Sequence, residues 1–260
     1  MSNIMSGTEL LSAALMIGAR LLTCGAEIYR VEESVTRVCL AYGAKSADVY
    51  AVPTAIIATI CMDETGEIIT QTCRITQRGT DLNKVDALNN LCRSVCICPI
   101  SYQQIQKEIH EIDACSVYSK RMLYCACGGG AMFFVLLFGG SFAAGLLAFV
   151  IGFLLQIFVI YSGQLGMHPL ITNLFGGMWI SLCALLGAAA GVSPNYDVVI
   201  IGSIMPLVPG LLMTNSIRDM IAGDFMAGIS RFSEALLIAA GIAAGAAIPL
   251  SMSQLLLGVF

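Results

Sequence analysis

The largely apolar stretch GSIMPLVPGLLMTNSIRD, at residues 202–219, is interrupted by two prolines, a glycine directly after the second, and then Asn215, Arg218 and Asp219. In a regular helix the carbonyl groups of Gly202 and Met205 would lose their donors, because Pro206 and Pro209 have no N–H. Unsatisfied polar groups cost several kcal/mol each in hydrocarbon, so such a break is tolerated where protein or a watery cavity surrounds it. The spacing therefore predicts a membrane helix that is broken near residues 206–210.

A new helix can begin at the break, because Pro209 suits the first position of a helix. The amides of Gly210, Leu211 and Leu212 would then face the break as the N-terminus of a half-helix. Such ends bind carboxylates, as in the discontinuous helices of secondary transporters. A simple packing kink at the two prolines is the alternative.

Asn215, Arg218 and Asp219 follow the break at spacings of three and four, which places them on one helical face. A charge costs ~3 kcal/mol at the centre of a span and less at its end, so these residues fit a gate or a substrate entry point. The alternative is an interfacial anchor with a local ion pair. Asn173, in PLITNLFGGMW, is the best second contributor to a pocket.

The chain that positions these residues has two dissimilar parts. It is 57% hydrophobic, and 24 of its 30 charged residues lie in residues 1–121. The mean hydropathy of +0.83 is typical of membrane proteins, and the net charge of −4 gives no case for a nucleic-acid partner. The sequence predicts an α-helical membrane protein, in which a small α+β domain at residues 1–117 precedes a membrane domain at residues 118–260.

Five stretches of the second part are long and apolar enough to span a membrane. They lie near residues 120–139, 141–163, 168–190, 197–217 and 231–257. With the N-terminus inside, the basic residues that flank these spans all lie on the cytoplasmic side: Lys120, Arg121, Arg218 and Arg231. The expected location is therefore the plasma membrane, with the N-terminal domain in the cytoplasm and the C-terminus outside.

The first part alternates helical and strand patterns. Apolar residues recur at spacings of three and four in residues 8–23, 24–43 and 81–95, which predicts helices. Ser101 and Gln104 form a capping box for a further helix. Between the helices predicted at residues 24–43 and 81–95, residues 51–76 are rich in Ile and Thr around a turn at Asp63–Gly66, which predicts a β-hairpin.

Glu27 and Arg30 begin a charge-rich helix in this domain. A solvated face with helix ion pairs is one interpretation, and a polar lining at the mouth of a transport pathway is the other. No phosphate loop, HExxH motif or nucleophile–base spacing occurs, so the sequence does not predict an enzyme. The eleven cysteines lack paired CxxC motifs or neighbouring histidines, so we expect small core residues rather than a metal site, and no cofactor.

Three segments resemble the threonine/serine exporter family. They are CGAEIYRVEESVTRVCLAYG at residues 24–43, VPTAIIATI at 52–60, and GSIMPLVPGLLMTNSIRDMIAGDFMAGISRFSEAL at 202–236. Members of this family either fuse two membrane halves or divide them between two proteins. This chain resembles the larger half, and its split-type relatives include a subunit of a bacterial succinate exporter.

The resemblance implies export of a small carboxylate metabolite, driven by an ion gradient, with a smaller membrane protein as partner. It places the site on matching residues, namely Pro206, Pro209, Gly210, Asn215, Arg218 and Asp219, and then Glu27 and Arg30. We therefore expect a subunit of a secondary transporter for threonine, serine or a dicarboxylate such as succinate, in contact with membrane lipid and able to form homo-oligomers. The alternative is a membrane-anchored sensing or assembly protein without transport activity of its own.

Overall fold

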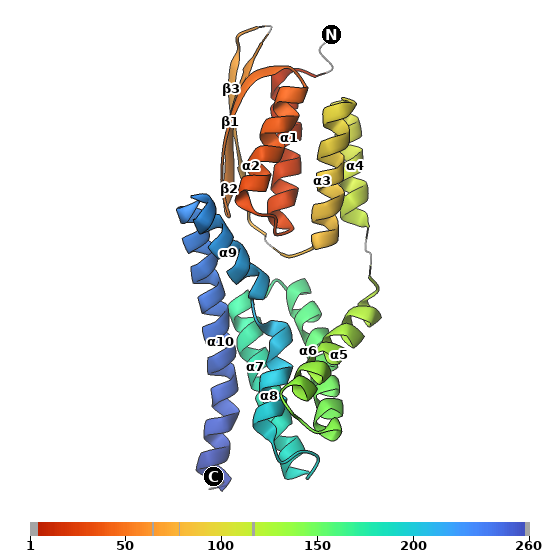
Figure 1. Cartoon of the computed structure of the whole chain (residues 1–260), viewed down its shortest axis with the longest axis vertical. Helices are drawn as coiled ribbons and strands as arrows, with labels where there is room; N and C mark the ends of the chain where they lie inside the picture. Colours follow the sequence, from red (N-terminus) through yellow and green to blue (C-terminus); the bar gives the residue numbers. More distant parts are fainter. Residues whose placement is uncertain (1–4, 64, 78, 116–117, 258–260) are drawn as a thin grey trace. The chain divides into compact units, whose positions relative to one another are not determined.

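The computed structural model describes residues 5–63, 65–77, 79–115 and 118–257. The chain is mostly helical and has one small antiparallel sheet. It divides into two compact units (Figure 1). The first unit contains residues 5–115 together with Leu211–Phe232, and the second contains residues 118–210 together with 233–257. A late segment of the chain therefore completes the N-terminal unit.

Four helices of the first unit follow the apolar periodicity of the sequence. They are α1 (Gly7–Thr23), α2 (Ile28–Ala41), α3 (Leu82–Ile97) and α4 (Tyr102–Ala114). The predicted capping box is present at the start of α4, where the side chain of Ser101 accepts from the Gln104 N–H and the Gln104 side chain accepts from the Ser101 N–H. A second box, formed by Ser6 and Glu9, begins α1.

The sheet has three strands, β1 (Ala44–Val52), β2 (Ala55–Met62) and β3 (Ile68–Arg74), paired in that order. The predicted hairpin corresponds to β2 and β3. β1 was not predicted, because its first half carries Lys45, Ser46 and Asp48, which have low strand propensity. The first two residues assigned to the hairpin instead end β1.

One core holds the first unit together. α1 contacts β2 and β3 and α2 contacts β1, while α3 and α4 lie against the other side of α1 and α2 (Figure 1). Leu11, Leu21, Val35, Ile56 and Ile60 are all at most 1% exposed. Each fully buried aliphatic side chain contributes about 1.5–3 kcal/mol, so this unit has a well-formed hydrophobic core.

The helices that follow α4 are mostly long and apolar, and most of their residues belong to the second unit. Four helices are long and apolar enough to cross a membrane, namely α5 (Lys120–Leu137), α6 (Phe142–Gln164), α7 (Pro169–Ala189) and α10 (Phe225–Leu257). A further pair, α8 (Tyr196–Ile204) with the 3₁₀ turn η1 (Met205–Leu207) and then α9 (Gly210–Ala222), is bent at its break. The described residues therefore contain four candidate spans, or five if the bent pair forms one span.

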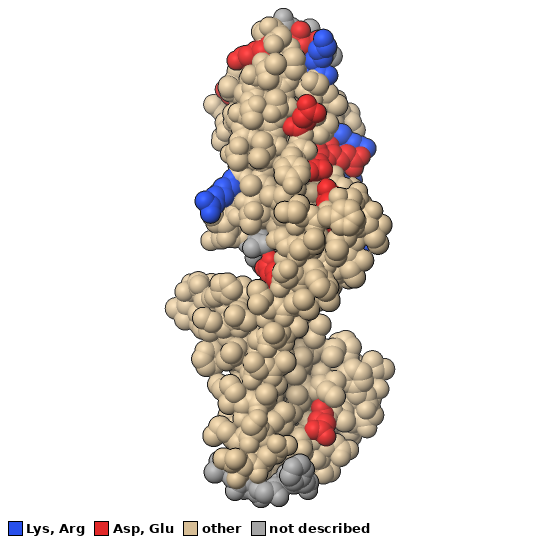
Figure 2. Space-filling model, turned by 90° about the vertical axis from the view of Figure 1, so that its left-hand side faces the viewer, with Lys and Arg blue, Asp and Glu red and all other residues tan. Residues whose placement is uncertain are grey.

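Glycines let these helices approach closely. A Cβ on Gly128 of α5 would lie 2.6 Å from the carbonyl oxygen of Phe149 in α6. Gly245 of α10 would meet the carbonyl of Leu174 in α7 in the same way. Small residues at such contacts are the usual means by which helices pack in lipid. Figure 2 shows the accompanying division of charge on one face, where Lys, Arg, Asp and Glu gather over part of the surface and the rest is almost uncharged.

Candidate functional site

The break predicted near residues 206–210 is present between α8 and α9. α8 ends at Ile204, η1 contains Pro206, Val208 is extended, and α9 begins at Gly210. The carbonyl of Met205, which we expected to be free, accepts from the Val208 N–H at 3.2 Å. A 3₁₀ turn thus replaces the donor that proline removes. The Gly210 N–H donates to the Val208 carbonyl at 2.8 Å, so this amide does not simply point into the break.

A short loop between α1 and α2 forms the other side of the polar site. Gly25 has a φ of +92°, a left-handed conformation in which a Cβ would also lie 3.1 Å from the carbonyl oxygen of Gly79. Glycine is therefore required at this turn. Glu27 occupies the N-cap position of α2, but its side chain makes no capping hydrogen bond. The loop and the first amide of α2 need other partners.

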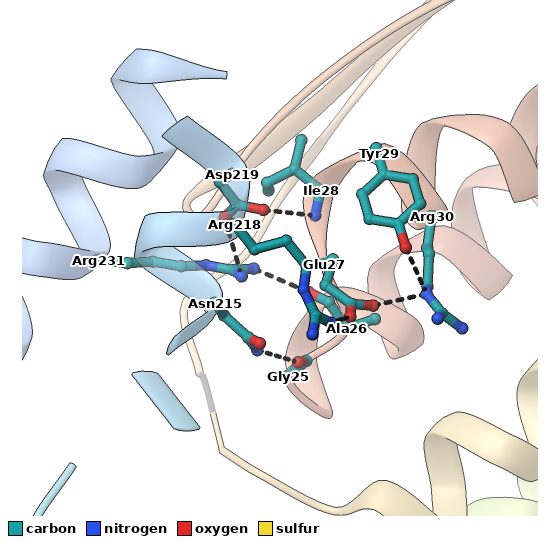
Figure 3. A network of polar contacts seen from close by, with 10 residues as sticks. All are labelled: Gly25, Ala26, Glu27, Ile28, Tyr29, Arg30, Asn215, Arg218, Asp219 and Arg231. Carbon is teal, nitrogen blue, oxygen red and sulfur yellow. Dashed lines mark hydrogen bonds and ion pairs between the residues drawn. The ribbon is translucent and has the colours of Figure 1, made fainter. Parts of the chain in front are cut away.

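α9 and the start of α10 supply these partners within the same unit (Figure 3). The Asn215 side-chain amide donates to the carbonyl of Gly25 at 3.1 Å. Arg231 Nη2 donates to the carbonyl of Ala26 at 2.8 Å. Asp219 Oδ1 accepts from the N–H of Ile28 at 3.3 Å, so a carboxylate from α9 caps the N-terminus of α2.

Asp219 and Arg231 form a buried ion pair. Asp219 Oδ2 lies 3.0 Å from Arg231 Nη1, and the two side chains are 0% and 6% exposed. The two atoms are not aligned as a hydrogen bond, so the contact is an ion pair by distance. A buried charge is costly unless it is paired. These two residues therefore hold α9 and α10 to the α1–α2 loop.

Glu27, Arg30 and Arg218 form a second, more open cluster. Glu27 Oε1 is paired with Arg218 Nη1, and Glu27 Oε2 lies 2.7 Å from Arg30 Nε. Half of the Arg218 side chain is exposed, whereas that of Glu27 is only 12% exposed. Arg30 Nε also donates to the Tyr29 hydroxyl at 3.1 Å. This hydroxyl, followed by the Glu27 carboxylate, raises the pKa of Arg30, which stays cationic.

The structure brings five of the predicted site residues into one network, namely Asn215, Arg218, Asp219, Glu27 and Arg30. The alternative of a local ion pair between neighbours on α9 does not occur. Arg218 instead pairs with Glu27, 191 residues away in the sequence, and Asp219 pairs with Arg231 at the start of the next helix.

The remaining predicted residues are not part of this network. Leu211 is 49% exposed in the first turn of α9. Pro206, Pro209, Gly210 and Asn173 belong to the second unit. The Asn173 side-chain amide donates to the carbonyl of Pro169 one turn earlier at 2.8 Å, a contact within its own helix.

Sequence reasoning missed Arg231 as a member of the site. It was assigned only to the flank of a span, as a topology signal. A better signal was available in the free energy that it costs to bury a charge in apolar surroundings. An arginine at the start of an apolar run of more than twenty residues needs a partner to offset that cost. In the described part of the chain no three His, Cys, Asp or Glu side chains come together as a metal site.

Comparison with known proteins gives a family match over most of the chain. The model of the family described as "Putative threonine/serine exporter" (ThrE) matches residues 12–253. This range includes the α1–α2 loop, the broken helix and the start of α10. No solved structure matches the chain.

Relatives of two lengths are similar to this chain. The "Threonine/serine exporter" of Corynebacterium glutamicum is 26% identical over 184 residues, which cover 68% of this chain and only 37% of that protein. The "Probable succinate transporter subunit YjjP" of Klebsiella aerogenes is 26% identical over 237 residues, 89% of each chain. Its namesake in Escherichia coli K12 is 23% identical over 241 residues, 92% of each. The chain thus spans about a third of one relative and nearly all of the others.

Proposed function

Because this chain belongs to the threonine/serine exporter family, we propose that it is a subunit of a secondary transporter that exports a small carboxylate metabolite across the plasma membrane. The observation that carries the proposal is the polar network, which joins two of the three segments that resemble the family. It includes Arg218, a half-exposed arginine in α9, the helix that follows the break. Threonine, serine and succinate are the substrates that the relatives' names suggest.

We propose Arg218 as the substrate's carboxylate contact, in competition with Glu27. In this structure the Glu27 carboxylate is paired with the Arg218 guanidinium, in the position that a substrate carboxylate would take. Glu27 also pairs with Arg30, so it keeps a cationic partner when Arg218 turns to substrate. Asp219 and Arg231 are buried and serve to hold the segment in place. The Leu211 and Leu212 amides in the first turn of α9 are a second candidate carboxylate contact in the first unit. In the second unit, we propose that Pro206, Pro209 and Gly210 shape the break and that Asn173 is a further polar site residue.

We propose that a smaller membrane protein completes the transporter. The relatives that this chain matches over nine-tenths of their length are named subunits, whereas the chain covers 37% and 46% of the exporters from C. glutamicum and Mycobacterium tuberculosis. The part of those exporters that this chain does not match would then correspond to a second protein. A homo-oligomer of this chain is the alternative source.

Five spans, a cytoplasmic N-terminal domain at residues 1–117 and an outside C-terminus are the topology we propose. A parity argument supports it: Leu211–Phe232 belongs to the same unit as residues 5–115, so the chain between them crosses the membrane an even number of times. α5, α6 and α7 supply three crossings, and the bent pair that begins with α8, counted as one span, would supply the fourth. The 33-residue α10 is about 50 Å long, well above the ~30 Å hydrocarbon core, so its first turns can remain outside the bilayer.

Efflux from cells preloaded with labelled threonine, serine or succinate tests the proposal. The chain is expressed alone and with its candidate small partner, and membrane insertion is verified in each case. We expect efflux with both proteins and none with Arg218→Ala, while Arg74→Ala, a change to an exposed arginine of β3, retains it. Efflux by the chain alone would favour the homo-oligomer. Wild-type efflux by Arg218→Ala would contradict the role of Arg218, and no efflux of any substrate would favour the sensing alternative.

A further inference from the structure

A cleft of about 530 Å³ lies between α2 and α3 in the N-terminal unit. α2 contributes Arg30, Ser34 and Arg37 at helical spacings of four and three, and α3 contributes one face of its own. That face consists of Asn89, Cys92, Arg93 and Cys96. The volume is in the range of small-molecule sites, about 300–1,000 Å³. The cleft could therefore hold a metabolite of modest size.

The charge of this cleft is opposite to that of its surroundings. Residues 1–117 contain nine Lys and Arg against thirteen Asp and Glu. The cleft nevertheless gathers three of the nine cations, Arg30, Arg37 and Arg93, with Glu33 as its single acidic lining residue. An acidic segment that concentrates arginines in one hollow has a local preference for anions.

The arginines from the two helices differ in how they are engaged. Arg93 Nη2 contacts the neutral side-chain oxygen of Asn90 at 2.5 Å and makes no ion pair among the described residues. Arg37 Nη2 lies 2.5 Å from Glu33 Oε1, but both side chains are more than half exposed. Exposed ion pairs contribute about 0–1 kcal/mol, so a ligand can recruit Arg37. Two cations on opposite walls are therefore available.

We propose that this cleft binds a small dianion, with the guanidinium groups of Arg37 and Arg93 as its cationic contacts from α2 and α3. Guanidinium forks bind carboxylate and phosphate oxygens with two parallel hydrogen bonds. The side-chain amide of Asn89 adds a neutral donor to the same lining. A dicarboxylate and inorganic phosphate share this chemistry, whereas an amino acid with one carboxylate and one ammonium group does not. Arg30 belongs both to this lining and to the Glu27 cluster, whereas the two proposed contacts, Arg37 and Arg93, lie outside that cluster, so the proposal does not depend on transport.

Binding to the purified full-length chain in detergent tests the proposal. Succinate, inorganic phosphate, threonine and sodium chloride at matched ionic strength are titrated in turn, with heat of binding as the readout. We expect succinate or phosphate to bind, and Arg37→Gln and Arg93→Gln each to weaken binding by about tenfold or more. Arg74→Gln, the same change at an exposed position of β3, should leave it unchanged. Equal binding by chloride or threonine, or no loss in the two variants, would overturn the proposal.

A second readout uses the wild-type chain and so does not depend on the variants folding. Cys96 lines the cleft, while Cys98, just beyond the end of α3, is exposed and lies outside the lining. The rate of alkylation of each cysteine is measured by mass spectrometry. The dianion that binds should slow the alkylation of Cys96 and leave that of Cys98 unchanged. Equal rates for Cys96 with and without the dianion would contradict the assignment. Because binding is measured on purified protein and export in cells, either proposal can fail without the other.

Discussion

Asp219→Ala should destabilise the N-terminal unit, because two other groups depend on this carboxylate. Asp219 accepts from the Ile28 N–H at 3.3 Å and pairs with Arg231 at 3.0 Å. Alanine would leave the first amide of α2 without this acceptor. It would also leave Arg231, only 5% exposed, without its carboxylate.

The expected magnitude follows from this burial. Removing one partner of a buried ion pair costs about 3–5 kcal/mol. Arg231 keeps its hydrogen bond to the Ala26 carbonyl at 2.8 Å, so we expect the lower end of this range. For a chain of this size that loss lowers the unfolding temperature by roughly 6–12 °C. Arg218→Ala breaks a half-exposed pair and should cost about 0–1 kcal/mol.

The assay is thermal unfolding of the full chain in detergent by circular dichroism, with hydrogen exchange of the peptide covering residues 24–31. Asp219→Ala should lower the unfolding temperature and speed exchange in that peptide, while Arg218→Ala changes neither markedly. The double change of Asp219→Leu with Arg231→Met should be less damaging than Asp219→Ala, because it removes both buried charges of the pair together. A wild-type unfolding temperature and unchanged exchange in Asp219→Ala would refute the reasoning.

Two further predictions concern the same unit. Gly228→Ala should cost about 1–3 kcal/mol, because its Cβ would lie 2.8 Å from a carbonyl oxygen of α9. Gly129→Ala in α5, with nothing within 4 Å of the new Cβ, should not destabilise the chain in the same unfolding assay. Burial, with the nearby Asp224 and Asp219 carboxylates, raises the pKa of Glu32, whose Oε1 accepts from the Ala51 N–H at 2.8 Å. The folded state therefore binds the proton of the Glu32 carboxyl group more tightly than the unfolded state does. The stability that this proton contributes is lost as pH rises through the pKa of Glu32 in the folded state. Glu32→Gln keeps an oxygen that can accept from the Ala51 N–H but carries no charge. It should therefore stabilise the chain relative to wild type at neutral pH and not at pH 4. The opposite trend across a pH series of unfolding curves would contradict the raised pKa of Glu32.

Sequence periodicity predicted the helices well, because each carries a clear apolar face. Leu11 and Leu21 in α1 and Val35 in α2 are all buried as their spacing indicated. The broken helix was also predictable, since two prolines three residues apart remove two backbone donors. Local rules did not predict which donor would replace the missing proline N–H. In the structure the Val208 N–H donates to the Met205 carbonyl through a 3₁₀ turn.

The partners within the site could not be predicted from local spacing. Arg218 and Asp219 are neighbours on one helix, and a local ion pair was one of the two interpretations that the sequence left open. Arg218 instead meets Glu27 from a distant segment, and Asp219 meets Arg231 from the next helix. The carbonyl groups of the α1–α2 loop gave no sequence signal at all, because every residue has one. Only the fold shows that α9 and α10 satisfy them.

The late segment Leu211–Phe232 has a consequence for the order in which the protein is made. Its contacts to residues 25–28 join positions 190–205 apart in sequence. Residues 5–115 leave the ribosome long before these partners exist, and α5 to α8 must be synthesised and inserted in between. The helices and sheet of the N-terminal unit can form early, since their contacts are mostly local, but the α1–α2 loop waits for α9 and α10. The last step in folding this unit therefore follows the synthesis of α5 to α8, and a chain that stops before α9 is left with an incomplete N-terminal unit.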